Sequence, residues 1–297
     1  MIPPVPASLL RMSGTLALVT DSTAMLPADT ARARGVLVVP LQVVVGATSY
    51  DEGVDAEASP ETIAAALREW TPVSTSRPTP TQFLEAYRRA HDEGAEEVVT
   101  IHLSADMSGT VESAHLAAKE SPVPVHVVDT RQLGMATGFA VLAAADVRDA
   151  GGSGEDAARA AVERARRTTS LFYVDTLEFL RRGGRIGAAA ALLGSALAVK
   201  PLLEIRDGRI ATREKVRTAA RALSRLEELA VTSAGSEPVD VAVAHLSNPD
   251  RAAALADSLR RRLEQNLEGR DLSVGEVGAV IGAHVGPGMV AVVVSPR

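Results

Sequence analysis

Short apolar runs alternate with amphipathic stretches through the first half of the chain. Strands are predicted at 16–19, 98–103 and 125–128, and one bent strand or two short ones at 36–45, where Pro40 interrupts a β-branched run. Apolar residues at helical spacing follow at about 60–70, 80–93, 111–118, 133–150 and 155–167. This alternation indicates a parallel sheet with helices on both faces.

The second half has a different pattern. Asp207–Gly208 lies between the apolar stretches 202–205 and 210–212 and predicts a tight hairpin. Strands are also predicted at 171–174, 239–244, 274–281 and 289–294, and helices at 186–199, 213–230 and 251–267. The hairpin and the two adjacent late strands predict a mixed sheet. We therefore expect an α/β protein with a flexible tail (1–13), an N-terminal parallel-sheet domain (14–167) and a C-terminal mixed-sheet domain (168–297).

Composition narrows the possible functions. The 297 residues include 46% hydrophobic and 23% charged side chains, as in a soluble globular protein, and the net charge of −6 disfavours nucleic acid as a partner. The absence of cysteine excludes disulfides, thiolate metal sites and a cysteine nucleophile. The longest apolar run, 186–199, is shorter than the ~18–20 residues of a spanning helix, and the first residues lack a signal-peptide pattern. We expect a cytoplasmic protein without stable membrane insertion.

Polar residues follow three strands of the first half. Each strand end carries hydroxyls and an acid: Thr20–Asp21–Ser22, Ser104–Ala105–Asp106 and Asp129–Thr130. Ligands bind beyond the carboxyl ends of parallel strands, so these ends predict a shared polar rim.

Three further sites have hydroxyl or imidazole groups suited to an anion. Ser108–Gly109 stands between a strand and a helix, where free N–H groups bind anions, although taken alone this pattern is more typical of Ser108 as a helix N-cap. Thr75 and Ser76 lie in a proline-rich stretch predicted as a loop, whose hydroxyls can also serve local hydrogen bonds. His284 is surrounded by small residues and can bind a carboxylate, act as a base, or be structural.

The stretch 172–208 combines a glycine pair, a single cation and an apolar run. Arg185 follows Gly183–Gly184 and precedes a segment with almost no polar side chain. A weakly polar helix with a guanidinium at its start suits an apolar molecule with an anionic end. The alternative is an ordinary buried core helix.

Common catalytic motifs are absent from the sequence. No GxSxG elbow surrounds a serine, the six histidines show no metal-binding spacing, and no Walker or GxGxxG motif is present. We therefore expect no metal and no cofactor. A hydrolase or phosphotransferase using Ser108 or His284 remains the alternative function.

Taken in order, these motifs resemble the DegV family of bacterial fatty-acid-binding proteins from about Leu16 onward. The resemblance rests on Val19–Thr20–Asp21–Ser22–Thr23, Thr75–Ser76–Arg77–Pro78, Ser108–Gly109–Thr110, Val174–Asp175–Thr176–Leu177, Gly183–Gly184–Arg185–Ile186, Lys200–Pro201–Leu202–Leu203 and Ile281–Gly282–Ala283–His284. Two positions depart from the usual pattern. Arg77 stands where glutamine is common, and Val111 replaces a frequent aromatic residue.

The resemblance implies a two-domain protein that holds one long-chain fatty acid between its domains and functions in phospholipid metabolism. It places the carboxylate at Thr75, Ser76, Ser108 and Gly109, with Arg185 and His284 beside it. The apolar run suggests tail-lining residues Ile186, Leu192, Leu193 and Leu197. The resemblance also implies a non-catalytic carrier subunit, which presents the carboxylate to a separate ATP-dependent fatty acid kinase that forms an acyl phosphate. The basic segment 213–217 is a candidate contact for this kinase.

Overall fold

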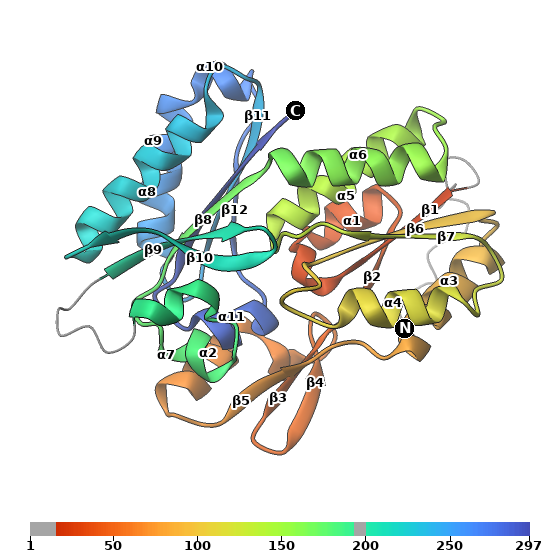
Figure 1. Cartoon of the computed structure of the whole chain (residues 1–297), viewed down its shortest axis with the longest axis horizontal. Coiled ribbons are helices and arrows are strands. Elements are labelled where there is room, and N and C mark those ends of the chain that lie inside the picture. The colour runs from red at the N-terminus through yellow and green to blue at the C-terminus, as the bar shows by residue number, and fades with distance from the viewer. Residues whose placement is uncertain (1–15, 193–199) are drawn as a thin grey trace, which may run out of the picture.

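The computed structural model describes residues 16–192 and 200–297 as an α/β protein with three sheets (Figure 1). The predicted tail (1–13) and two of the predicted tail-lining residues, Leu193 and Leu197, lie outside the described residues. In the described ranges, no helix combines the length and the apolar composition needed to cross a membrane.

A four-stranded parallel sheet forms the first half, as predicted. Its order is β2-β1-β6-β7, with β1 at Leu16–Asp21, β2 at Val36–Val39, β6 at Glu97–His102 and β7 at Val125–Asp129. One face packs on α5 (Met135–Asp149) and α6 (Gly154–Arg167), and the other packs on α3 (Pro80–Asp92) and α4 (Thr110–Ala118). Alternate residues of β1 supply the two faces, since Leu16 and Leu18 join one cluster and Ala17 and Val19 the other.

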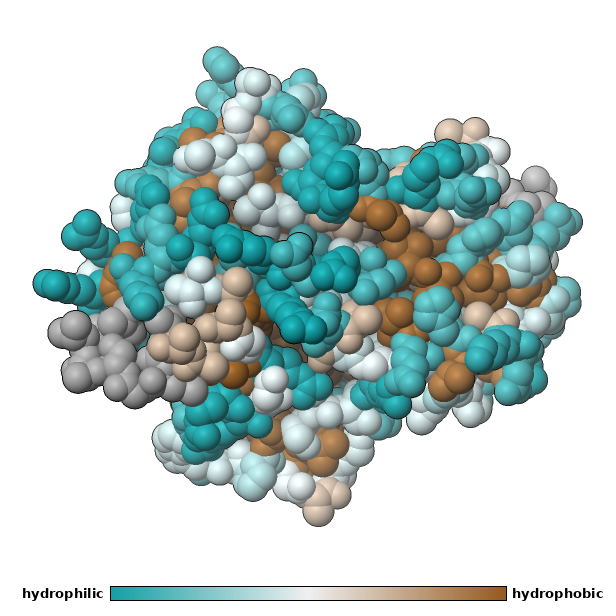
Figure 2. All heavy atoms as spheres, viewed as in Figure 1, coloured by the Kyte–Doolittle hydropathy of each residue, from teal (hydrophilic) through white to brown (hydrophobic). Residues whose placement is uncertain are grey.

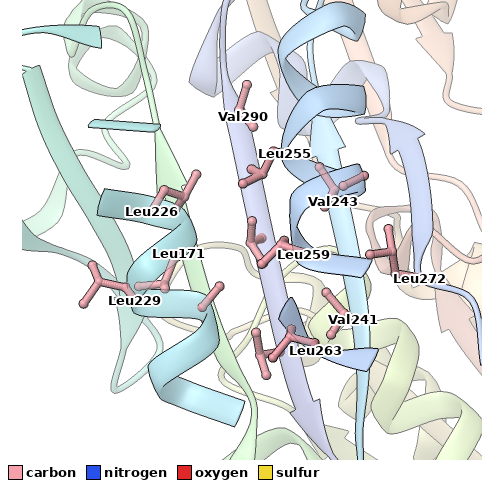
Figure 3. Close-up of a cluster of buried hydrophobic side chains, with 14 of the residues drawn as sticks. Leu171, Leu226, Leu229, Val241, Val243, Leu255, Leu259, Leu263, Leu272 and Val290 are labelled. Atoms are coloured by element: carbon pink, nitrogen blue, oxygen red, sulfur yellow. The ribbon is translucent and has the colours of Figure 1, made fainter. Parts of the chain in front are cut away.

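A six-stranded mixed sheet forms the second half, again as predicted. Its order is β10-β9-β8-β13-β11-β12, with β8 at Thr169–Tyr173, β9 at Lys200–Arg206, β10 at Arg209–Val216, β11 at Val239–His245, β12 at Ser273–Glu276 and β13 at Val290–Pro296. Asp207 and Gly208 both have positive φ, as the predicted two-residue hairpin turn requires. Two helices, α8 (Ala219–Ala234) and α9 (Pro249–Arg262), cover one face, hereafter the outer face, with interlocking leucines and valines (Figure 3).

A three-stranded antiparallel sheet was not predicted. Its order is β4-β3-β5, with β3 at Gln42–Val45, β4 at Thr48–Asp51 and β5 at Val73–Ser76. The β-branched run divided by Pro40 therefore contributes β2 to one sheet and β3 to another. With α2 (Pro60–Arg68), this small sheet packs on Phe179 and on α11 (Ala279–Val285), both from the second half (Figure 1).

Three predicted elements of the second half differ from the structure in its described residues. The strand expected at 274–281 ends at Glu276, and Ile281 and His284 lie on α11, because a short apolar run does not distinguish a strand from a buried helix. The helix expected from Arg213 begins only at Ala219, because the preceding residues extend β10 and pair with β9. The helix expected at 186–199 is, in its described part, the 3₁₀ segment η4 (Gly187–Leu192).

The remaining short elements connect these layers: η2 (Ser22–Ala24), α1 (Ala28–Ala33), η3 (Ala56–Ala58), α7 (Glu178–Arg182) and α10 (Glu264–Leu267). Most of the surface in Figure 2 is hydrophilic, but hydrophobic residues gather along the edge strand β7 between α4 and α6. Leu116 and Val162 are exposed on those two helices.

Candidate functional site

A cavity of about 360 Å³ lies where the three sheets meet. Its walls come from η2, the end of β5, the loop after β6, α7 and the loop that follows it, β10 and α11. All six residues predicted at the anionic end line it, although they come from distant parts of the chain: Thr75, Ser76, Ser108, Gly109, Arg185 and His284. Such a volume is within the usual range for a small-molecule site.

Thr75 and Ser76 lie on β5, which is an edge strand and not the predicted loop. β5 pairs only with β3 in the small sheet, and an edge position tolerates the prolines that flank it. The Thr75 hydroxyl lies 2.9 Å from Nε2 of His284, on α11. The pairing of β5 with β3 and the packing of both on α11 therefore set the position of this hydroxyl.

His284 carries a neutral, partly buried imidazole. Burial, with a smaller contribution from the positive charge of Arg185, lowers the pKa of His284 to about 4. Its Nδ1 is buried beside Gly183 and has no hydrogen-bond partner among the described residues. When Nε2–H donates to the Thr75 oxygen, the Thr75 hydroxyl proton is free to donate to an anion in the cavity.

Ser108 is not the N-cap of α4, because Gly109 occupies that position without any side-chain cap bond. The Ser108 hydroxyl instead lies 2.9 Å from the Thr110 hydroxyl and faces the cavity. It therefore lies at the positive end of α4, where an anion is favoured.

Arg185 holds the loop that carries Ser108. Its Nε donates to the carbonyl oxygen of Met107 at 3.0 Å, and its Nη1 donates to the carbonyl oxygen of Gly183 at 2.6 Å. These bonds fix the guanidinium beside the cavity. Arg185 consequently both contributes positive charge and positions Ser108.

A second, almost wholly apolar cavity of about 70 Å³ adjoins the first. The two share four lining residues: Leu133, Ile210, Ile281 and Val285. The second cavity extends over the inner face of the six-stranded sheet, the face opposite α8 and α9, where Phe172, Ala244 and Ala291 line it. The site thus has a polar end and an apolar arm.

The residues of this arm were not predicted from the sequence. Ile186 packs against the apolar cluster that includes Phe172 and Ile281, but it lines neither cavity, and Leu192 is the last residue of η4. The missed signal lies in the strands. In β11 and β13, valines on one face of the sheet alternate with other residues on the opposite face. Three of these other residues are alanines, and the alanines face the cavity.

The predicted polar rim joins the walls of the site. Asp21 is fully buried, and its Oδ2 accepts from the backbone N–H of Leu103 at 3.2 Å and contacts His102 Nδ1 at 2.9 Å. Its Oδ1 accepts from the backbone N–H of Thr23 at 3.0 Å. Thr23 and Leu103 both line the cavity, so Asp21 supports two of its walls.

The rim also attaches the β9–β10 hairpin to the first half. Ser104 donates to the carbonyl oxygen of Gly208 at 2.7 Å, and Arg209 donates to Asp106 at 2.7 Å. The hairpin carries Ile205 and Ile210 over the cavities. This contact closes the site from the side of the parallel sheet.

The geometry does not assemble a serine–histidine pair. Ser108 bonds to Thr110 and His284 bonds to Thr75, and no hydrogen bond among the described residues joins Ser108 to a histidine. In the same ranges, no group of three or more His, Cys, Asp or Glu side chains could hold a metal ion.

Comparison with known proteins identifies relatives along nearly the whole chain. Residues 15–297 match the model of a family described as uncharacterised proteins of the DegV family. A DegV domain-containing protein of Streptomyces coelicolor is 56% identical over 96% of this chain and 100% of its own length.

Two solved structures share the fold. A DegV family protein from Thermus thermophilus, described by its fatty acid binding, matches with a TM-score of 0.86 and 36% identity over 95% of this chain and 99% of its own. DegV from Bacillus subtilis, described as a fatty acid binding protein, matches with a TM-score of 0.86 and 30% identity over the same shares.

Proposed function

The chain belongs to the DegV family, and we propose on that basis that it binds one long-chain fatty acid between the halves predicted as two domains. The carboxylate lies in the polar cavity and the acyl tail in the apolar arm. The observation that carries this proposal is that the apolar cavity adjoins the polar one and shares four lining residues with it.

The head group is bound by hydroxyls and one helix end. Thr75 and Ser108 donate to the carboxylate oxygens, and charge-assisted bonds of this kind are stronger than neutral ones. Ser76 and Gly109 complete the wall, and Arg185 adds positive charge without being displaced from its two carbonyl partners. The low pKa of His284 keeps the imidazole neutral at physiological pH, so it orients Thr75 instead of forming an ion pair.

The tail provides most of the affinity. Each methylene group that moves from water into apolar surroundings contributes about 0.8 kcal/mol to the free energy of binding. The arm is lined by residues such as Phe172, Ile205 and Met289, and among its described lining residues only Ser170 has a polar side-chain group. Because Ser170 donates its hydroxyl proton to Gln132, the arm presents a nearly uniform apolar wall.

Lipid extraction tests the proposal. Denaturation of protein that was expressed in bacteria should release a long-chain fatty acid, which mass spectrometry detects. Protein that carries no lipid and also fails to bind added fatty acid would contradict the proposed function.

The carrier role is the second part of the proposal: this cytoplasmic protein presents the bound carboxylate to a separate ATP-dependent kinase. A basic groove at the junction of β10 and α8 supports it, with Lys215, Arg217 and Arg221 in its walls. Charge reversal by Arg217→Glu should abolish capture of the kinase in a pull-down while fatty acid binding is retained. Capture that survives this substitution places the docking surface elsewhere.

A further inference from the structure

Arg77 links the two segments that carry the head-group hydroxyls. It follows Thr75 and Ser76 at the end of β5 and lines the polar cavity. Its Nη1 reaches across to α4 and donates to the carbonyl oxygen of Gly109 at 3.2 Å and to a carboxylate oxygen of Glu112 at 2.5 Å. A Cβ added at Gly109 would overlap this guanidinium, so the close crossing depends on glycine at that position.

The Arg77–Glu112 pair is exposed and weakly held. The two side chains are 46% and 67% exposed, and solvent screens an ion pair in such surroundings, so the pair contributes little to stability. No hydrogen bond within the described ranges uses Nε or Nη2 of Arg77, so the ion pair is held through Nη1 alone.

The two cations of the site therefore differ in their partners. Arg185 is bonded to backbone carbonyls, which remain in place when a ligand arrives. Arg77 is bonded to a side-chain carboxylate, which is chemically the same group as the head of a fatty acid. A planar guanidinium binds either carboxylate with the same fork of donors.

We infer that Glu112 competes with the anionic head group of the ligand for Arg77, and that this competition sets the affinity of the site for a carboxylate. The inference rests on the proposed function and assigns to Arg77 and Glu112 a role in the specificity of that site. Without ligand, Glu112 neutralises Arg77 at the mouth of the cavity. With ligand, Arg77 turns from Glu112 to the carboxylate and closes over it.

Four matched variants and one double variant test the competition. Glu112→Gln and Arg77→Gln are compared with Glu120→Gln and Arg88→Gln, which make the same charge changes at exposed positions that line neither cavity. Delipidated protein is titrated with palmitic acid and with the corresponding uncharged fatty alcohol, and circular dichroism checks that each variant is folded.

Glu112→Gln should bind palmitic acid about three- to fivefold more tightly, and Arg77→Gln about fivefold less tightly, because each changes one exposed ion pair. The double variant should match Arg77→Gln alone, since Glu112 acts only through Arg77. Affinity for the alcohol should not change in any of them.

Two results overturn the inference. If Glu112→Gln keeps its gain in the Arg77→Gln background, Glu112 acts by direct repulsion of the ligand. If both single variants match their controls, Arg77 does not contact the head group. A wild-type protein that binds no palmitic acid contradicts the proposed function itself, so the two failures are distinguishable.

Discussion

The two faces of the six-stranded sheet are formed by the same strands, but one face packs against helices and the other lines a cavity. On the outer face, Val241 and Val243 of β11 and Val290 of β13 interlock with leucines of α8 and α9 (Figure 3). On the inner face, Ala244 of β11 lies directly opposite Ala291 of β13, and both line the apolar cavity. Residues that are one position apart thus belong either to a filled core or to a ligand space, which makes stability and binding separable.

The filled outer face should show the largest effect. Leu259 is fully buried in the α9 layer, so Leu259→Ala should lower the free energy of unfolding by about 2–5 kcal/mol. Under conditions in which the variant is folded, its affinity for fatty acid should equal that of the wild type. Urea unfolding and fatty acid titration on the same sample test both statements, and a parallel loss of affinity would show that the faces are coupled.

A matched pair of substitutions on β11 tests the two faces one position apart. Ala244→Leu fills the apolar cavity and displaces about three methylenes of the ligand, which should weaken long-chain fatty acid binding by about 2–3 kcal/mol with little change in stability. Val243→Leu adds bulk to the filled face, so it should lower the free energy of unfolding by about 1–3 kcal/mol and leave binding intact.

Ligand series and thermal melts separate these outcomes. Ala244→Leu should lose less affinity for shorter acyl chains than for long ones, because a shorter tail does not reach the filled space. If it binds all lengths as the wild type does, the tail lies outside the arm.

Sequence alone found the polar end of the site but not its apolar arm. Hydroxyls, a histidine and an arginine beside glycines are informative residue types, and Thr75, Ser108, Arg185 and His284 could be selected before their elements were known. The arm depends on which face of a strand a helix covers, and this follows from the order of strands in the sheet. In the sequence, Ala244 looks like an ordinary strand residue. Its position at the cavity follows only from the pairing of β11 with β13 and from the packing of α9 on the opposite face.

The fold shows the same division. The Asp207–Gly208 hairpin was predictable because the turn chemistry is local. The helix at His284 was not, because α11 is placed by distant contacts such as that of Glu52, which follows β4 and accepts a hydrogen bond from the backbone N–H of Val280 at 2.8 Å.

The head-group hydroxyls should have effects of about 1–3 kcal/mol on binding, because their removal leaves buried acceptors of the ligand unpaired. Thr75→Ala should also lower the melting temperature, since it removes the hydrogen-bond partner of Nε2 in the partly buried His284. Ser108→Ala should not, because the Ser108 hydroxyl bonds only to the neighbouring Thr110 within the described ranges. Unchanged affinity in the double variant would place the head group elsewhere.

The smallest predicted effect concerns Glu52, a buried residue whose carboxylate contacts α11 at Val280. Burial, together with the negative charge of Asp21, raises the pKa of Glu52 above its usual value of 4.5. Oε1 accepts from Val280, and Oε2 is buried without a partner among the described residues. Since the folded pKa exceeds the unfolded one, Glu52 lowers the free energy of unfolding as the pH rises from about 4.5 through the folded value.

Glu52→Gln keeps the acceptor for Val280 and removes this titration. Its advantage in unfolding free energy over the wild type should therefore be absent near pH 4 and grow toward neutral pH, where the wild-type side chain must ionise in a buried position. Glu57→Gln, at an exposed position of η3, corrects for the general loss of one carboxylate. Urea unfolding across this pH range measures the difference, and an advantage for Glu52→Gln that shrinks as the pH rises would show that Glu52 stabilises the fold in its ionised form.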